Sequence, residues 1–177
     1  MEKAGDVVLE TESSPIDVTN IESRSLTVST SSGMITFQAL SKQLVDQFIK
    51  ISNSSGGTDL RSSLSSPSVL VETRSGSLRL AATTTATEFK VKNFSGSING
   101  DVEYSKETSV SSYENGSGSL NIALKSWSGF LTADSGSGSK HIRGQGLEKW
   151  KGGWRKGDED STATFTTRSG SIDVEVF

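Results

Sequence analysis

The residues that could carry acid–base chemistry are few and lie toward the C-terminal end of the chain. His141 is the only histidine, so catalysis through an imidazole would have to use it. In the repeat alignment given below, Asn121, His141 and Asp173 hold the same position in three repeats, so we expect them to be neighbours. A carboxylate beside a histidine orients the ring and favours its charged form. The hypothesis is that Asn121, His141 and Asp173 form an acid–base site. The alternative is that His141 is only a surface residue in a polar column.

A second group of candidate residues lies in a stretch at about 143–160 that contains no Ser and interrupts the repeats. Trp150 and Trp154 stand here beside Lys151 and Arg155. Exposed Trp rings can stack on a sugar, an aromatic ligand or a partner, while the cations bind an anionic group. Long excursions from a regular scaffold often carry binding residues. The alternative is that at least one Trp folds back and covers an open end of the fold.

Composition excludes several other kinds of site. The chain has no Cys, so neither a disulfide nor a cysteine-based zinc site can form. The sequence contains no metal-binding or phosphate-binding motif, and we expect no metal and no cofactor. The net charge of −3 gives no basic footprint for nucleic acid.

The sequence does not reveal where the protein works. No apolar run approaches the roughly 20 residues that a membrane span needs. Residues 1–6 are too short and too polar for a signal peptide, so the localisation is unknown.

The abundance of 34 Ser and 18 Gly first suggests disorder, but these residues recur at a fixed spacing. Ser-Gly-Ser followed by Leu or Ile occurs at four places, and weaker copies occur at four more. These eight turns are centred on Ser14, Gly33, Gly56, Gly76, Gly96, Gly118, Gly138 and Gly170. Their steps are 19 to 23 residues, except for a last step of 32 that contains the insertion. A period near 20 residues is typical of a repeat architecture.

Residues that were not used to find the repeat support it. The residue five before each turn is always apolar or aromatic. These residues are Leu9, Val28, Ile51, Val71, Val91, Tyr113, Ala133 and Phe165. Seven residues before the turn the only exception is Ser111, and four residues after it the only exception is Gly100. Polar residues lie between these columns, so each copy predicts a strand, a turn and a second strand.

We therefore predict a single all-β domain over residues 1–177, with the insertion at about 143–160. The favoured fold is a β-solenoid of about eight roughly 20-residue coils, in which equivalent residues stack about 4.8 Å apart. The alternative is an antiparallel β-sandwich or barrel, in which the Ser-Gly turns would be hairpins. Charges of alternating sign at Glu72, Lys92 and Glu114 favour in-register stacking.

Three asparagines, Asn53, Asn93 and Asn115, each stand three residues before a turn and begin an Asn-x-Ser sequon. In a secreted eukaryotic protein they could carry glycans. The favoured interpretation is structural, because Asn often makes hydrogen bonds to the backbone near a turn.

The Ser-Gly-Ser-Ile/Leu repeats and the closing segment from Thr167 to Val174 resemble adhesin-type β-solenoid domains of bacterial and fungal proteins. The resemblance covers about residues 7–177. It implies a repeat fold with an adhesin-like label and no catalytic residues to carry over.

The ends of the repeat suggest association. Apolar strand residues begin at Val7, and the chain closes on Ile172, Val174, Val176 and Phe177 without a polar capping segment. An uncapped solenoid exposes strand edges. We therefore expect either a piece of a longer secreted or surface protein, or self-association through the solenoid ends.

Two functions remain open. The preferred one is a non-catalytic module for adhesion, scaffolding or capture of a glycan or small-molecule ligand, with Trp150, Trp154, Lys151 and Arg155 as the contact site. The alternative is an enzyme that acts on a carbohydrate or small aromatic molecule with His141 and Asp173 beneath the Trp loop.

Overall fold

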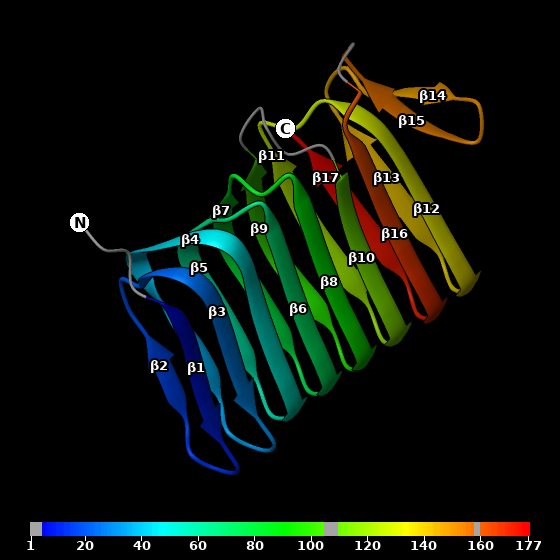
Figure 1. The fold of residues 1–177 in the computed structure, drawn as a ribbon. Helices are drawn as coiled ribbons and strands as arrows, with labels where there is room; N and C mark the ends of the chain where they lie inside the picture. Colours follow the sequence, from blue (N-terminus) through cyan, green and yellow to red (C-terminus); the bar gives the residue numbers. More distant parts are fainter. Residues whose placement is uncertain (1–4, 105–109, 158–159) are drawn as a thin grey trace.

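The computed structural model describes residues 5–104, 110–157 and 160–177, with the backbone alone for residues 39–42. Strands make up 75% of it, and this part of the chain contains no helix. The strands stack into two layers that face each other across a narrow core (Figure 1). No helix in the described ranges is long and apolar enough to span a membrane.

The first layer holds the strands that lead into the Ser-Gly turns. In spatial order they are β1 (Asp6–Thr11), β3 (Glu22–Thr30), the second half of β4 (Ile35–Ser55), β6 (Ser68–Ser75), β8 (Glu88–Ser95), β10 (Val110–Ser117), β16 (Thr162–Ser169) and β12 (Gly129–Ser137). Each pairs in parallel with its neighbours.

The second layer holds the strands that leave the turns. In spatial order they are β2 (Ile16–Val18), the first half of β4, β5 (Thr58–Ser65), β7 (Leu78–Thr84), β9 (Ile98–Tyr104), β11 (Leu120–Lys125), β17 (Ile172–Val176) and β13 (Lys140–Gly144). These pairings are also parallel. A short hairpin of β14 (Glu148–Trp150) and β15 (Gly153–Lys156) lies outside both layers.

The parallel pairing confirms the β-solenoid and excludes the antiparallel sandwich or barrel. The apolar columns of the sequence are the observed registers: Val71 lies opposite Val91, Val91 opposite Tyr113, and Tyr113 opposite Phe165. The predicted count of about eight coils differs slightly from the structure, in which about five turns form the regular part of the solenoid. Five coils follow one another regularly, from β3–β4 to β10–β11. The first coil has only a three-residue second strand, and the last two coils leave the chain order.

The C-terminal coil lies inside the stack. Strand β16 pairs with β10 on one side and with β12 on the other, and β17 lies between β11 and β13 in the same way (Figure 1). After coil β12–β13 the chain forms the hairpin β14–β15 outside the stack. It then forms a last coil, β16–β17, between coils β10–β11 and β12–β13. The expectation that the chain closes on an uncapped end of the solenoid was wrong for Ile172, Val174 and Val176, which are fully or almost fully buried, whereas Phe177 is 57% exposed.

Inward side chains give a physical reason for this order. The inserted coil contributes Phe165, Ile172 and Val176 to the core, all 1% exposed or less. The equivalent positions of the outer coil are Ala133, Lys140 and Gly144. The coil with the larger apolar side chains gains more from burial on both sides. A lysine at an inward position also discourages another strand from adding to the open edge.

The core contains one aromatic stack and one polar cluster. The rings of Tyr113 and Phe165 stack with centroids 4.8 Å apart, and Phe89 lies 6.1 Å from Tyr113 on the other side. The hydroxyl groups of Tyr104 and Tyr113 hydrogen-bond to each other. Ser111, the exception in its apolar column, hydrogen-bonds to Tyr104 and donates to the carbonyl of Thr162. This exception therefore supplies a partner for a buried hydroxyl.

A column of buried polar side chains lies beside the turns, and several of its members bond one coil to its neighbour. It consists of the residues three before the turns: Thr30, Asn53, Thr73, Asn93, Asn115, Thr167 and the partly buried Ser135. Asn93 Nδ2 donates to the carbonyl of Gly76 over 3.2 Å, and Asn115 Nδ2 donates to that of Gly96 over 2.9 Å. Because these asparagines are 3–4% exposed, the structural interpretation of the three sequons is the better one.

We predict that Asn93→Ala destabilises the protein by about 1–3 kcal/mol, because it leaves the buried carbonyl of Gly76 without its side-chain donor. The measurement is urea unfolding followed by circular dichroism. The matched control is Asn99→Ala, which removes an exposed amide from the next strand of the same coil and should change stability by less than about 0.5 kcal/mol. Equal effects of the two substitutions would contradict the role of the polar column.

We also predict that Gly170→Val expels the inserted coil while the N-terminal coils stay folded. Gly170 has a φ of +132°, and a Cβ there would lie 2.1 Å from the carbonyl oxygen of Gly118. Each coil of a solenoid contacts only its neighbours, so the damage should be local. Hydrogen exchange with mass spectrometry should show lost protection over residues 162–176 and retained protection over β5–β8. Gly5→Val, where a Cβ meets nothing within 4 Å, is the control; protection of residues 162–176 that survives Gly170→Val would refute the prediction.

Candidate functional site

The structure brings together the three residues of the acid–base hypothesis, in a different order from the chain. Asn121 of β11 pairs in register with Asp173 of β17, and Asp173 pairs with His141 of β13. Asp173 is therefore the central residue, because the C-terminal coil is inserted. All three lie on the outer face of the second layer, and Asn121 and His141 are exposed.

The carboxylate of Asp173 is already engaged by another residue. Arg143 donates to Asp173 Oδ1 over 2.7 Å and to Glu175 Oε2 over 3.3 Å. The hydrogen bond that Arg143 donates to Glu175 and the negative charge of Asp173 raise the pKa of Arg143 above its usual value. Within the described ranges, no hydrogen bond joins His141 to Asp173. The arrangement is an exposed ion-pair cluster, in which Arg143 takes the place that the hypothesis gave to the histidine.

The insertion folds into the hairpin β14–β15, which is attached to the outermost coil. Strand β15 pairs antiparallel with the start of β12, with Trp154 opposite Leu131. Trp154 is partly buried and packs against the core, which agrees with the alternative of a Trp that covers an open end. Trp150 is 48% exposed. Residues 158 and 159 of the predicted insertion lie outside the described residues.

The tip of the hairpin presents Trp150 with a cation beside it. Lys151 and Gly152 form the tight turn with φ angles of 35° and 84°, as a two-residue hairpin turn requires. Lys151 Nζ lies 5.6 Å from the centre of the Trp150 ring. Residues 148–156 carry Lys149, Lys151, Arg155 and Lys156 against the single acid Glu148. We call this segment the basic hairpin; it combines an exposed aromatic ring with positive charge.

A groove that sequence reasoning did not identify lies on the first layer, beside the Ser-Gly turns. It has a volume of about 1120 Å³ and extends over six coils. Its walls are the outward residues two and four before each turn, and its floor is the strand backbone between them, at the positions whose side chains form the inward polar column. The alternating charges of Glu72, Lys92 and Glu114 were the available signal, because these residues form one wall.

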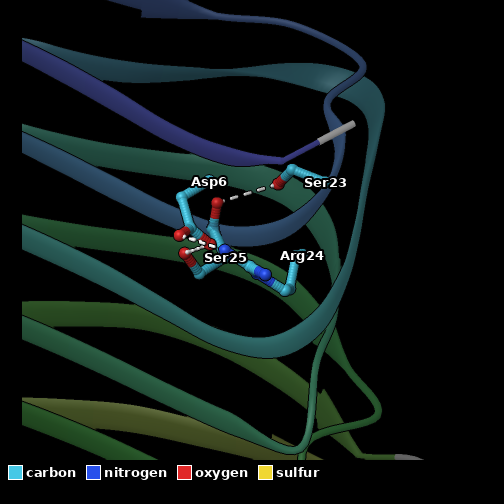
Figure 2. Close-up of polar contacts among 4 residues, drawn as sticks. All are labelled: Asp6, Ser23, Arg24 and Ser25. Carbon is cyan, nitrogen blue, oxygen red and sulfur yellow. Dashed lines mark hydrogen bonds and ion pairs between the residues drawn. The ribbon is translucent and has the colours of Figure 1, made fainter. Parts of the chain in front are cut away.

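Strongly shifted pKa values often mark functional sites, but here the clearest shifts have structural causes. The carboxylate of Asp6 accepts hydrogen bonds from Arg24 Nη2 over 2.6 Å and from the Ser25 hydroxyl over 2.6 Å (Figure 2). Hydrogen bonds from Arg24 and then Ser25 lower the pKa of Asp6 to about 2. Arg24 and Ser25 belong to β3 and the partner belongs to β1, so this contact fastens the first coil to the second.

The other clear shift belongs to the buried tyrosine pair. Burial raises the pKa of Tyr104 to about 12, and it raises the pKa of Tyr113 as well. Both rings are closed off inside the core. Across the residues that the structure describes, no group of three or more His, Cys, Asp or Glu side chains could hold a metal ion.

Comparison with known proteins identifies one family. Residues 1–143 match the model of the Toastrack DUF4097 family. The match ends in β13, so the basic hairpin and the inserted coil lie outside it. No curated protein and no solved structure matches. The solenoid fold expected from the adhesin-type resemblance is confirmed, whereas the adhesin-like label stays a prediction.

The Asp6 contact predicts how the first coil responds to acid. The folded-state pKa of about 2 lies below the ordinary value of about 3.9 for an unfolded chain. The contribution to stability is therefore present above about pH 4 and is lost as the pH falls through about 2. Carboxyl NMR should give Asp6 a midpoint near 2, and amide exchange in β1 should accelerate between these pH values. Asp6→Asn should make β1 exchange fast at neutral pH, whereas Glu12→Gln should not; a midpoint near 4 would contradict the contact.

Proposed function

The chain belongs to the Toastrack DUF4097 family, a β-solenoid domain of unknown function, and on that premise we propose that it is a non-catalytic module that captures a ligand with its basic hairpin. The observation that carries the proposal is the exposure of Trp150 at the tip of a hairpin that is paired to the solenoid. The solenoid acts as a scaffold, and the hairpin is the contact site.

The support for the hairpin makes Trp150 a suitable anchor. Strand β15 pairs with β12 on one side and with β14 on the other, and Trp154 packs against the core. Trp150 therefore projects from a fixed base, so little conformational entropy is lost when it binds. Tryptophan and arginine are enriched among the residues that contribute most to binding. Arg155 lies on the same hairpin, where its Nε donates to the carbonyl of Gly157.

The chemistry of the tip favours a ligand with a flat apolar face and a negative charge. The Trp150 ring offers an apolar surface, and the exposed Lys151 lies beside it. An acidic sugar has both features, because its ring stacks on an aromatic face and its carboxylate or sulfate binds cations. We therefore propose an acidic glycan as the ligand, which fits a function in adhesion or ligand capture.

The alternative of an enzyme that uses His141 and Asp173 has less support. A general acid–base pair needs the two side chains within hydrogen-bonding reach of each other and of a substrate. Arg143 occupies the carboxylate of Asp173, and neither His141 nor Asp173 lines the groove.

We predict that Trp150→Ala lowers the affinity for acidic oligosaccharides at least tenfold without changing the thermal stability, because the ring is exposed. The probe is an array of acidic and neutral oligosaccharides, followed by calorimetry on each hit. Lys151→Ala should weaken binding several-fold and reduce its dependence on salt. The charge-matched control is Lys50→Ala, an exposed lysine on the far coils of the stack, which should bind as the wild type does.

A second variant separates binding from packing. Trp154→Ala should lower the melting temperature, because it removes a ring that packs against the core. A wild-type protein that binds no acidic glycan at millimolar concentration would refute the proposed ligand. Full affinity in Trp150→Ala would refute the proposed contact site.

A further inference from the structure

The groove on the first layer is separate from the basic hairpin. The hairpin pairs with β12 at Gly129–Leu131, whereas the groove reaches the same strand at Asp134 and Gly136. Three residues of extended strand place these points roughly 10 Å apart along β12, and the groove then continues away from the hairpin over β16, β10, β8, β6 and β4. A ligand of the groove would therefore lie along the solenoid axis, across the strands.

The strand backbone forms the floor of the groove, because the side chains of the polar column point inward, as Asn53 does toward Thr58. Among the described residues, five buried side-chain atoms lack a hydrogen-bond partner. Four of them belong to the polar column under the groove: Asn53 Oδ1, Thr73 Oγ1, Asn93 Oδ1 and Asn115 Oδ1. Each of these side chains is more than nine-tenths buried. Because these atoms face the interior of the solenoid, a ligand in the groove is held by the outward residues of the two walls, which repeat at coils about 4.8 Å apart.

One wall of the groove carries an exposed aromatic side chain, Phe94, on which a ligand ring can stack. Phe94 is 65% exposed, more than any other large apolar side chain in the described ranges. Its neighbour on the next coil is Gly116, where a Cβ would lie 2.4 Å from the carbonyl oxygen of Phe94. A side chain on that coil would cover the face of the ring, so the glycine leaves it open. Arg74 and Arg168 stand on the coils to either side of this pair.

The charges of the groove balance. Glu72, Glu114 and Asp134 are opposed by the equal number of cations Arg74, Lys92 and Arg168. Lys92 and Glu114 also pair with each other, with Nζ and Oε2 3.4 Å apart. A polyanion would meet these carboxylates, and a polycation would meet the arginines. Carboxylate, guanidinium and amide groups all bind neighbouring hydroxyl groups, so the lining favours a neutral ligand rich in hydroxyls.

From these observations we propose that the groove binds a linear, neutral oligosaccharide along the solenoid axis. One sugar ring stacks on Phe94 over the gap at Gly116. Hydroxyl groups of adjacent sugars bind Arg74, Arg168 and the carboxylates of the opposite wall. An extended peptide fits less well, because the walls are side chains and offer no free strand edge for backbone pairing.

The test uses the full chain and a panel of neutral linear hexasaccharides with their monosaccharides, measured by calorimetry. We expect at least one hexasaccharide to bind and its monosaccharide to bind at least a hundredfold more weakly, because the groove extends over six coils. Phe94→Ala should weaken binding at least tenfold, and Arg74→Ala several-fold. Both side chains are exposed, so melting curves should stay unchanged.

Two controls separate this site from other surfaces. Phe48→Ala removes an exposed ring on the first layer outside the groove and should bind as the wild type does. Trp150→Ala should keep full affinity for the neutral hexasaccharide, so the groove and the hairpin can fail independently. No binding to the panel at millimolar concentration, full affinity in Phe94→Ala, or displacement of the sugar by a mixed-charge peptide would each overturn the proposal.

Discussion

The structure depends on the close, in-register approach of successive coils at the Ser-Gly turns. There the backbone of one coil bonds directly to the next, as Gly76 N donates to the carbonyl of Ser95 over 3.1 Å and Leu78 N to that of Ser97 over 2.9 Å. The polar column adds side-chain donors to a second row of carbonyls in these turns, those of Gly33, Gly76, Gly96 and Gly118. Because the turns fix the register, apolar residues at the same position of neighbouring coils pack against each other on both sides of the turn. The thin core of this chain is sufficient since the backbone contributes so many of the contacts between coils.

This constraint explains why much of the fold could be predicted. Strand alternation and the spacing of turns determine which residues lie at the same position of each coil, and the observed registers agree with the columns from Leu9 to Phe165. The columns do not determine the spatial order of the coils, because any two coils with matching columns can stack on each other. Lys140 and Ala133 carried the missing signal: an inward lysine and a small residue mark a coil that suits an open end and is poorly suited to the interior.

The candidate sites were predictable to a smaller extent for a related reason. Column positions correctly made neighbours of Asn121, His141 and Asp173, but they could not show that Arg143, two residues further along β13, would take the carboxylate. The split between Trp150 and Trp154 depends on antiparallel pairing with β12, a long-range contact that local pattern does not encode. The groove was missed because its parts are distant in sequence and become a surface only when six coils are stacked.

Stacking also explains how one scaffold can present two surfaces of different character. Outward residues at the same distance in sequence from the turn form a continuous row along the stack. A charge change in a single coil therefore alters only one point of that row. In the groove, opposite charges in neighbouring coils cancel, as Lys92 and Glu114 do, and a long, neutral surface results. The basic hairpin lies outside the stack, so its cations have no opposing row of charges from neighbouring coils, and one of them, Lys151, lies beside the Trp150 ring. Positive charge is therefore concentrated where the repeat is interrupted, whereas the regular coils give length and a balance of charge.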